Sequence, residues 1–284
     1  MTKTRVLAAL IMAPLAIGGV LLLPTAWLML IAAAVFLVAL WEWLKLADVE
    51  DLLARNILLA CNLAVMVALV WGSRSADGST TLALLQLVSL LGVAWWLLAM
   101  LWLLHFDFAS DHDTHARVFK LGAGTLAVVP AWCAMGVIHA TDPNGHQWLL
   151  LALFLVWAAD TGAYFAGRTF GGKLFGGRKL APRISPNKTI EGLLGGVVLA
   201  VAVAVIGAKL IGTDNSALLA VIAVAIVTVL FSVVGDLFES LLKRHVNVKD
   251  SSNLIPGHGG VLDRVDSVLA ALPVFALGKA VLGF

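Results

Sequence analysis

The stretch SALLAVIAVAIVTVLFSVVGDLFESLL, residues 216–242, decides the fold of this chain. It is longer and more apolar than the roughly 20 residues that a helix needs to cross a bilayer. It also contains Asp236 and Glu239. A charge near the bilayer centre costs roughly 2.5–3.5 kcal/mol, so these acids need partners or a water-filled cavity. The stretch therefore predicts a membrane helix that also carries chemistry.

Similar apolar runs recur along the 284 residues, of which 61% are hydrophobic and 13% charged. Ordinary soluble domains have roughly 45–50% apolar and about 25% charged residues, so both a soluble and a disordered protein are excluded. We predict an all-α, polytopic, single integral membrane domain over residues 1–284 with about nine transmembrane helices. The expected spans are 6–23, 25–44, 56–72, 81–104, 118–139, 147–167, 190–212, 216–242 and 262–283.

Cationic residues are strongly biased to one side of these spans. All lysines and arginines except Arg74, Lys209 and Lys279 fall on the side of the N-terminus, which the positive-inside rule makes cytoplasmic. The first span follows Lys3 and Arg5 like a signal peptide, but its apolar core is long and another span follows at once. We expect a multi-pass protein of the cell (inner) membrane, since no organellar targeting segment is visible.

Small and aromatic residues in the spans are interpreted structurally. Gly192, Gly195 and Gly196 permit close packing of helices. Tryptophans near span ends are expected to anchor helices at the membrane interface; they are Trp27, Trp41, Trp43, Trp95, Trp96 and Trp148.

Acids gather near the cytoplasmic ends of the last spans. Asp160 lies in the span 147–167, and Asp263 and Asp266 begin the span 262–283. In the span 216–242 helical spacing predicts one polar stripe, made of Ser232, Asp236, Glu239, Ser240 and Lys243. The stripe either forms structural ion pairs, with Asp263 bound to Arg264 or Asp266 to Lys243, or binds a divalent cation that bridges carboxylates and a polyphosphate.

The cytoplasmic loops 168–189 and 243–261 combine cations with many glycines. Cations and exposed backbone amides together suit phosphate binding. Residues 167–173 match the beginning of a P-loop, but Leu174 stands where that motif needs Ser or Thr, and a membrane helix precedes it. We therefore predict anion-binding loops without a nucleotide-binding fold.

A longer motif begins at Ser240 and continues through Lys243-Arg244, Lys249-Asp250 and Ser252 to Ile255-Pro256-Gly257-His258-Gly259-Gly260-Val261-Leu262-Asp263-Arg264-Val265-Asp266. It closely resembles the signature of the phosphatidate cytidylyltransferases, or CDP-diacylglycerol synthases. Residues 160–168 and 185–192 resemble other segments of that family. The resemblance is firm over about 157–270, so residues 147–284 are expected to be catalytic, whereas the helices within 1–140 have no assigned role.

The resemblance implies an Mg²⁺-dependent nucleotidyltransferase that converts CTP and phosphatidic acid to CDP-diacylglycerol and pyrophosphate in phospholipid biosynthesis. It also implies a homodimer, and no nucleic-acid partner is expected. Charge must be neutralised on nucleophile, reacting phosphorus and leaving group, so positioning and electrostatics dominate. No covalent nucleophile is needed.

We assign roles on this basis. Asp236 and Asp263 are expected to bind the metal, with Asp160 and Asp266 as further ligands or as their partners, and one or two ions fit this number of acids. His258 either donates to the leaving pyrophosphate or caps the ninth helix. The expected catalytic residues are Asp236, Asp263, Lys243, Arg264 and His258, and the expected substrate-binding residues are Ser185, Asn187, Lys188, Arg244, Lys249, Gly259 and Gly260.

Two alternatives are weaker. A CTP-dependent polyprenol or phytol kinase shares the metal and the membrane setting, but it would not carry the full 240–266 motif. An ion-coupled transporter would distribute its acids through the bilayer midplane and repeat its helices, whereas here the acids crowd at the cytoplasmic ends. The residues that recognise cytosine, the acyl-chain preference and the choice between CTP and dCTP do not follow from the sequence.

Overall fold

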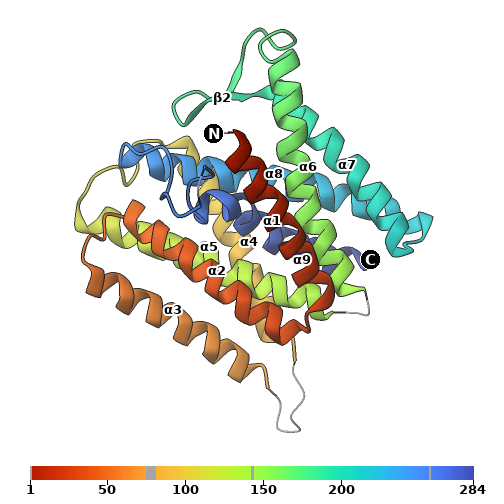
Figure 1. Cartoon of the computed structure of the whole chain (residues 1–284), viewed down its shortest axis with the longest axis horizontal. Coiled ribbons are helices and arrows are strands. Elements are labelled where there is room, and N and C mark those ends of the chain that lie inside the picture. Colours follow the sequence, from red (N-terminus) through yellow and green to blue (C-terminus); the bar gives the residue numbers. More distant parts are fainter. Residues whose placement is uncertain (1, 75–80, 142–143, 256) are drawn as a thin grey trace.

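A computed structural model describes residues 2–74, 81–141, 144–255 and 257–284 (Figure 1). Pro256 of the quoted motif therefore lies outside the described residues. Nine α-helices and two short strands follow one another in these ranges. They are α1 (Thr2–Leu22), α2 (Thr25–Leu46), α3 (Leu52–Gly72), α4 (Ala83–Leu104), α5 (Thr114–Ala140), α6 (Gly145–Phe170), β1 (Lys179–Ala181), β2 (Ser185–Thr189), α7 (Ile190–Ile211), α8 (Leu218–His245) and α9 (Leu262–Leu282).

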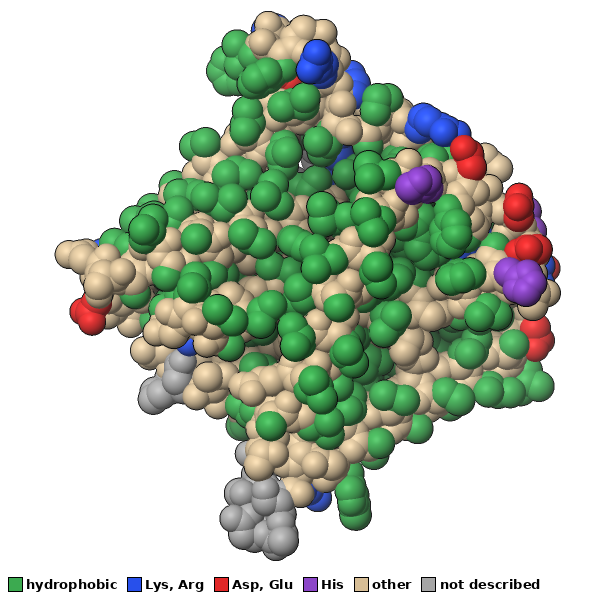
Figure 2. All heavy atoms as spheres, turned by 180° about the vertical axis from the view of Figure 1, so that it is seen from behind, with side chains coloured by type: hydrophobic (Ala, Val, Ile, Leu, Met, Phe, Trp, Pro, Cys, Tyr) green, Lys and Arg blue, Asp and Glu red, His purple; other side chains and the backbone are tan. Residues whose placement is uncertain are grey.

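The prediction of an all-α polytopic membrane protein is confirmed. Over the described residues, eight helices are long and apolar enough to cross a membrane, namely α2 to α9. In α1 the apolar stretch found is Leu10–Leu22, which is shorter than these spans. Figure 2 shows hydrophobic side chains over most of one face of the molecule, as a surface in contact with lipid requires.

A small hairpin, which the sequence did not predict, joins α6 to α7. Strands β1 and β2 pair antiparallel, with Lys179 opposite Thr189 and Ala181 opposite Ser185. In Figure 1 the hairpin, near the label β2, lies beside the last turns of α6. Thr189 ends β2 and caps α7, because its hydroxyl accepts the Gly192 amide at 3.0 Å. The hairpin is thus fixed directly to the start of a membrane helix.

Helices α6 and α7 pack backbone against backbone (Figure 1). A Cβ at Gly162 would lie 2.5 Å from the Gly195 carbonyl oxygen, and one at Gly196 would lie 2.7 Å from that of Ala159. Real side chains do not tolerate such distances, so the predicted role of the glycines in close packing is confirmed.

An aromatic cluster joins α2, α4 and α8 around Phe238. Its ring lies 5.2–6.0 Å from the ring centroids of Trp43, Trp95, Trp96 and Trp102. The prediction that tryptophans anchor helices at the interface is wrong for Trp43, Trp95, Trp96 and Trp148, because all four are buried, the first three around Phe238 and Trp148 beside Phe284. Burying these large rings against other aromatic side chains gains more than interfacial exposure would. The cluster fixes α8 one residue from Glu239.

Candidate functional site

A cavity of about 350 Å³ lies where α6, α7, α8 and β2 meet. Its polar lining consists of Asp160, Tyr164, Ser185, Asn187, Lys188, Thr189 and Asp236. Most of the remaining lining is apolar and includes Ala163, Leu193 and Val233. The cavity can therefore receive a charged group and an adjoining apolar one.

Lys188 joins the hairpin to α8 across this cavity. Its Nζ lies 2.5 Å from Oδ2 of Asp236, and both side chains are about a quarter to a third exposed, at 25% and 31%. On the other carboxylate oxygen, Ser240 approaches Oδ1 at 3.4 Å. The hairpin thus brings the predicted residues Ser185, Asn187 and Lys188 to the carboxylate of Asp236.

Asp160 and Asp266 belong to the same electrostatic environment. Asp160 lines the cavity and interacts electrostatically with Asp236, Lys188 and Arg264. Asp266 interacts in the same way with Asp236 and Asp160. Asp160, Asp236 and Asp266 therefore influence one another electrostatically. Within the described part of the chain, however, no three acidic, histidine or cysteine side chains are grouped closely enough to hold a metal ion.

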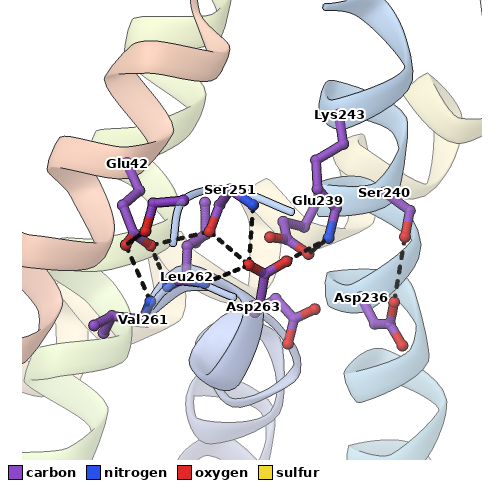
Figure 3. A network of polar contacts seen from close by, with 12 residues as sticks. Glu42, Asp236, Glu239, Ser240, Lys243, Ser251, Val261, Leu262 and Asp263 are labelled. Atoms are coloured by element: carbon purple, nitrogen blue, oxygen red, sulfur yellow. Dashed lines mark hydrogen bonds and ion pairs between the residues drawn. The ribbon is translucent and has the colours of Figure 1, made fainter. Parts of the chain in front are cut away.

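A second polar centre lies between α8 and α9 (Figure 3). Lys243 Nζ lies 2.5 Å from Glu239 Oε2 and 2.7 Å from Asp263 Oδ1. The ion-pair interpretation of the polar stripe expected Asp263 to pair with Arg264, or Asp266 to pair with Lys243. The structure instead pairs Lys243 with Glu239 and Asp263, because α8 carries Glu239 one turn before Lys243.

The second oxygen of Asp263 is fully engaged. Its Oδ2 accepts the backbone amide of Ser251 at 2.9 Å, the hydroxyl of Ser251 at 2.8 Å and the amide of Gly260 at 2.8 Å. Only Oδ1 faces the Lys243 ammonium. Asp263 thus presents one oxygen to the site and uses the other to hold the preceding loop.

Glu42 of α2 completes this centre, and the sequence analysis missed it. The residue is fully buried. Its Oε2 accepts the Leu262 amide at 2.7 Å, and its Oε1 accepts the Ser252 hydroxyl at 2.5 Å and the Val261 amide at 3.1 Å (Figure 3). The Ser251 hydroxyl lies 3.0 Å from Oε2 and shares its single proton between Glu42 and Asp263. A carboxylate inside the second expected span was a signal of the same kind as Asp236.

The backbone amides of the glycine-rich loop after α6 bind a carboxylate of the protein itself, that of Glu191. Glu191 is buried, and its Oε1 accepts the amides of Gly172, Leu174 and Phe175 at 3.1, 3.3 and 3.2 Å. These amides are therefore engaged, so their availability to a phosphate, expected from the glycines, does not hold in this arrangement. Glu191 itself was given no role from the sequence.

The remaining predicted residues are placed as follows. Arg244 Nε donates to the Ile184 carbonyl at 3.1 Å, which ties α8 to the hairpin. Arg264 and Lys249 are exposed. His258 is partly buried, and its Nδ1 has no hydrogen-bond partner in the part of the chain that is described. Its alternative role as a helix cap is filled by Glu42, which accepts the first amides of α9.

The two glycines of the motif are required by space. Gly259 has φ +80°, and a Cβ there would lie 2.6 Å from Asp263 Oδ2. A Cβ at Gly260 would lie 2.1 Å from Ser251 Oγ and 2.4 Å from Glu42 Oε2. The amide of Gly260 already donates to Asp263. The loop can therefore approach both carboxylates only because these positions lack side chains.

Comparison with known proteins gives one consistent result. Residues 3–281 match the model of the cytidylyltransferase family. The chain is 40% identical over 276 residues to a phosphatidate cytidylyltransferase of Pseudomonas aeruginosa, covering 97% of this chain and 96% of the relative. It is 37% identical to one from Haemophilus influenzae, covering 97% and 98%, and 32% identical to one from Staphylococcus saprophyticus, covering 96% and 95%. The similarity extends beyond residues 157–270 and includes the helix that carries Glu42.

Proposed function

The chain belongs to the cytidylyltransferase family, and we propose that its cavity and the adjoining α8–α9 centre are where it transfers the cytidylyl group of CTP to phosphatidic acid. The products are CDP-diacylglycerol and pyrophosphate. The observation that carries this location is the cavity lining, which combines Lys188, Asp236 and Asp160 with apolar side chains. A phosphate bonded to a diacylglycerol needs both kinds of surface.

The reaction forms a bond between a phosphate oxygen of the lipid and the α-phosphorus of CTP, and it breaks the bond to the pyrophosphate. Negative charge is present on both reactants and grows on the leaving group. Lys188 and Lys243 carry the ammonium groups nearest the carboxylates, and each is only partly exposed. They orient the phosphates in this low-dielectric site, where a charge acts more strongly than in water.

Magnesium is the metal ion that the family resemblance implies. The donor atoms suit this ion, because Asp160, Asp236, Asp263 and Asp266 supply hard carboxylate oxygens. Among the described residues no three such side chains stand close enough together to hold an ion as they are placed, so the acids would have to draw together on binding. Ammonium groups now neutralise Asp236 and Asp263. Asp236 and Asp263 would hold the ion, with Asp160 and Asp266 as further ligands or partners, and the ion would supply charge neutralisation on the phosphates.

The orientation follows from the same proposal. CTP is a cytosolic nucleotide, so the hairpin and the loop 246–261 would face the cytoplasm of a cell with the enzyme in its inner membrane, as the positive-inside bias predicts. Labelling of single cysteines at Lys179 and Thr213 in intact cells tests this. A membrane-impermeant reagent should reach Cys at 213 and not Cys at 179. A homodimer is proposed from the resemblance, and cross-linking in membranes tests it.

The reaction itself is tested with detergent-purified protein, CTP, phosphatidic acid and magnesium, with each substrate omitted in turn. Formation of CDP-lipid and pyrophosphate by the wild type, lost in Asp263→Asn and Asp236→Asn, supports the assignment. Phosphorylation of a polyprenol without CDP-lipid would instead support the kinase alternative.

A further inference from the structure

Glu42 lies in the N-terminal half of the chain, yet both of its carboxylate oxygens form hydrogen bonds with the C-terminal part of the site. Its four donors all belong to residues 251–262. Among them, the Val261 amide belongs to the residue just before α9 and the Leu262 amide to the first residue of that helix. A buried carboxylate is costly unless its oxygens are satisfied. The buried carboxylate of Glu42 is therefore stabilised by the segment 251–262, and it holds that segment in place in return.

Ser251 connects Glu42 to Asp263. Its hydroxyl lies 3.0 Å from Glu42 Oε2 and 2.8 Å from Asp263 Oδ2, and its amide donates to the same Asp263 oxygen at 2.9 Å. Gly260 is packed against both Ser251 and Glu42 with no room for a methyl group. A displacement of Ser251 or of the start of α9 would thus rotate the Asp263 carboxylate.

We propose that Glu42 is a positioning residue for the transfer reaction. It touches neither substrate. By holding Ser251 and the first turn of α9, it keeps Oδ2 of Asp263 bound to the loop and Oδ1 directed at Lys243. This inference rests on the proposed function, because it needs Asp263 to act in the site.

A second observation favours positioning over simple packing. Glu42 is flanked by Trp41 and Trp43, and Trp43 alone already joins α2 to the core through Phe238 and through its Nε1 donation to the Lys120 carbonyl at 2.9 Å. Helix α2 is therefore anchored without Glu42. What Glu42 adds is contact with the loop that precedes Asp263.

The first test is Glu42→Gln, with Glu50→Gln as the matched control on an exposed acid of the next loop. The glutamine keeps the shape but replaces one acceptor oxygen by an amide that faces two donors. We expect kcat to fall about 30-fold while KM for CTP changes less than about threefold, the pattern of a residue needed for geometry rather than for ground-state binding. Hydrogen exchange of the 251–262 peptide should rise, and Glu50→Gln should change neither quantity.

The second test separates Ser251 from Ser252. Ser251→Ala removes the hydroxyl that Glu42 shares with Asp263. Ser252→Ala removes a hydroxyl that donates to Glu42 and accepts the Leu254 amide but has no recorded hydrogen bond to Asp263. We expect kcat to fall about tenfold in the first and about twofold in the second. If Glu42 acts through Ser251, the double variant Glu42→Gln/Ser251→Ala should lose no more than about 30-fold, far from the roughly 300-fold product of independent effects.

The outcomes are distinguishable. A wild type that forms no CDP-lipid overturns the proposed function and this inference with it. An active wild type that loses activity in Asp263→Asn, while Glu42→Gln keeps the wild-type kcat, overturns only the role of Glu42. Independent losses in the double variant also overturn it. If Glu42→Gln does not fold, equal kcat values for Ser251→Ala and Ser252→Ala decide against the inference.

Discussion

The ammonium of Lys188 lies 2.5 Å from the carboxylate of Asp236 in the lining of a cavity that is otherwise largely apolar. This ion pair joins the β1–β2 hairpin to the polar stripe of α8, of which Asp236 is a member. A phosphate that enters the cavity would compete with Asp236 for the Lys188 ammonium. Both residues are therefore poised to exchange partners when substrate binds.

Replacing Lys188 by glutamine should lower kcat/KM for CTP by tenfold or more, since a hydrogen bond to a charged group contributes about 1.5–3 kcal/mol. Initial rates over a range of CTP concentrations measure it. Lys179→Gln, at the exposed first residue of strand β1 in the same hairpin, is the control and should keep the wild-type value. Equal kcat/KM values for the two variants would remove Lys188 from the substrate site.

Replacing Glu191 by alanine should loosen the loop between α6 and β1, because three backbone amides lose their acceptor. Loss of one charge-assisted interaction of about 1.5 kcal/mol corresponds to an about tenfold larger population of the open loop. Trypsin should therefore cleave after Lys173 and Arg178 about tenfold faster, as followed by mass spectrometry. Glu50→Ala is the control, and cleavage at the wild-type rate in Glu191→Ala would contradict the anchoring role.

Replacing Gly260 by alanine should reduce CDP-lipid formation about 100-fold, because a Cβ there meets Ser251 Oγ at 2.1 Å and Glu42 Oε2 at 2.4 Å, and a displacement of about 1 Å can cost that much in rate. The same change at Gly122, where no atom lies within 4 Å of the added Cβ, should be harmless. The activity of the two purified variants decides the matter, and an active Gly260→Ala would show that the loop adapts.

Replacing Phe238 by alanine should destabilise the protein by about 3–5 kcal/mol, since it empties the centre of the tryptophan cluster. Thermal unfolding in detergent measures the loss. Phe165→Ala, at a side chain that is 62% exposed, should leave the midpoint unchanged. A midpoint for Phe238→Ala equal to that of the wild type would mean that the four tryptophans repack without it.

The sequence predicted those features that depend on local pattern. Apolar length predicted the spans, and a charge inside an apolar run pointed to Asp160 and Asp236. The spacing of the 240–266 motif led to the family. Helical periodicity also placed Glu239 and Lys243 on one face, and the structure joins them.

Contacts between distant segments could not be predicted in this way. Glu42 and Ser251 are separated by 209 positions, and no local pattern relates them. The tryptophans near span ends resembled interface anchors because of their positions in the sequence. Their burial against Phe238 depends on how α2, α4 and α8 pack, which no local pattern shows. Glu191 was visible beside Gly192, yet nothing in the sequence showed that its carboxylate would occupy the amides of the glycine-rich loop.

The backbone contact between α6 and α7 has a consequence for inhibitors. Because Gly162, Gly195 and Gly196 have no side chains to rearrange, a compound cannot open a cryptic cleft between these helices by changing rotamers; it would have to separate two backbones. A compound that enters the cavity instead meets the closely packed backbones of α6 and α7, which do not move apart to enlarge the cavity. Its affinity should therefore depend on a preformed match of shape and charge, and rigid scaffolds should be favoured over flexible ones.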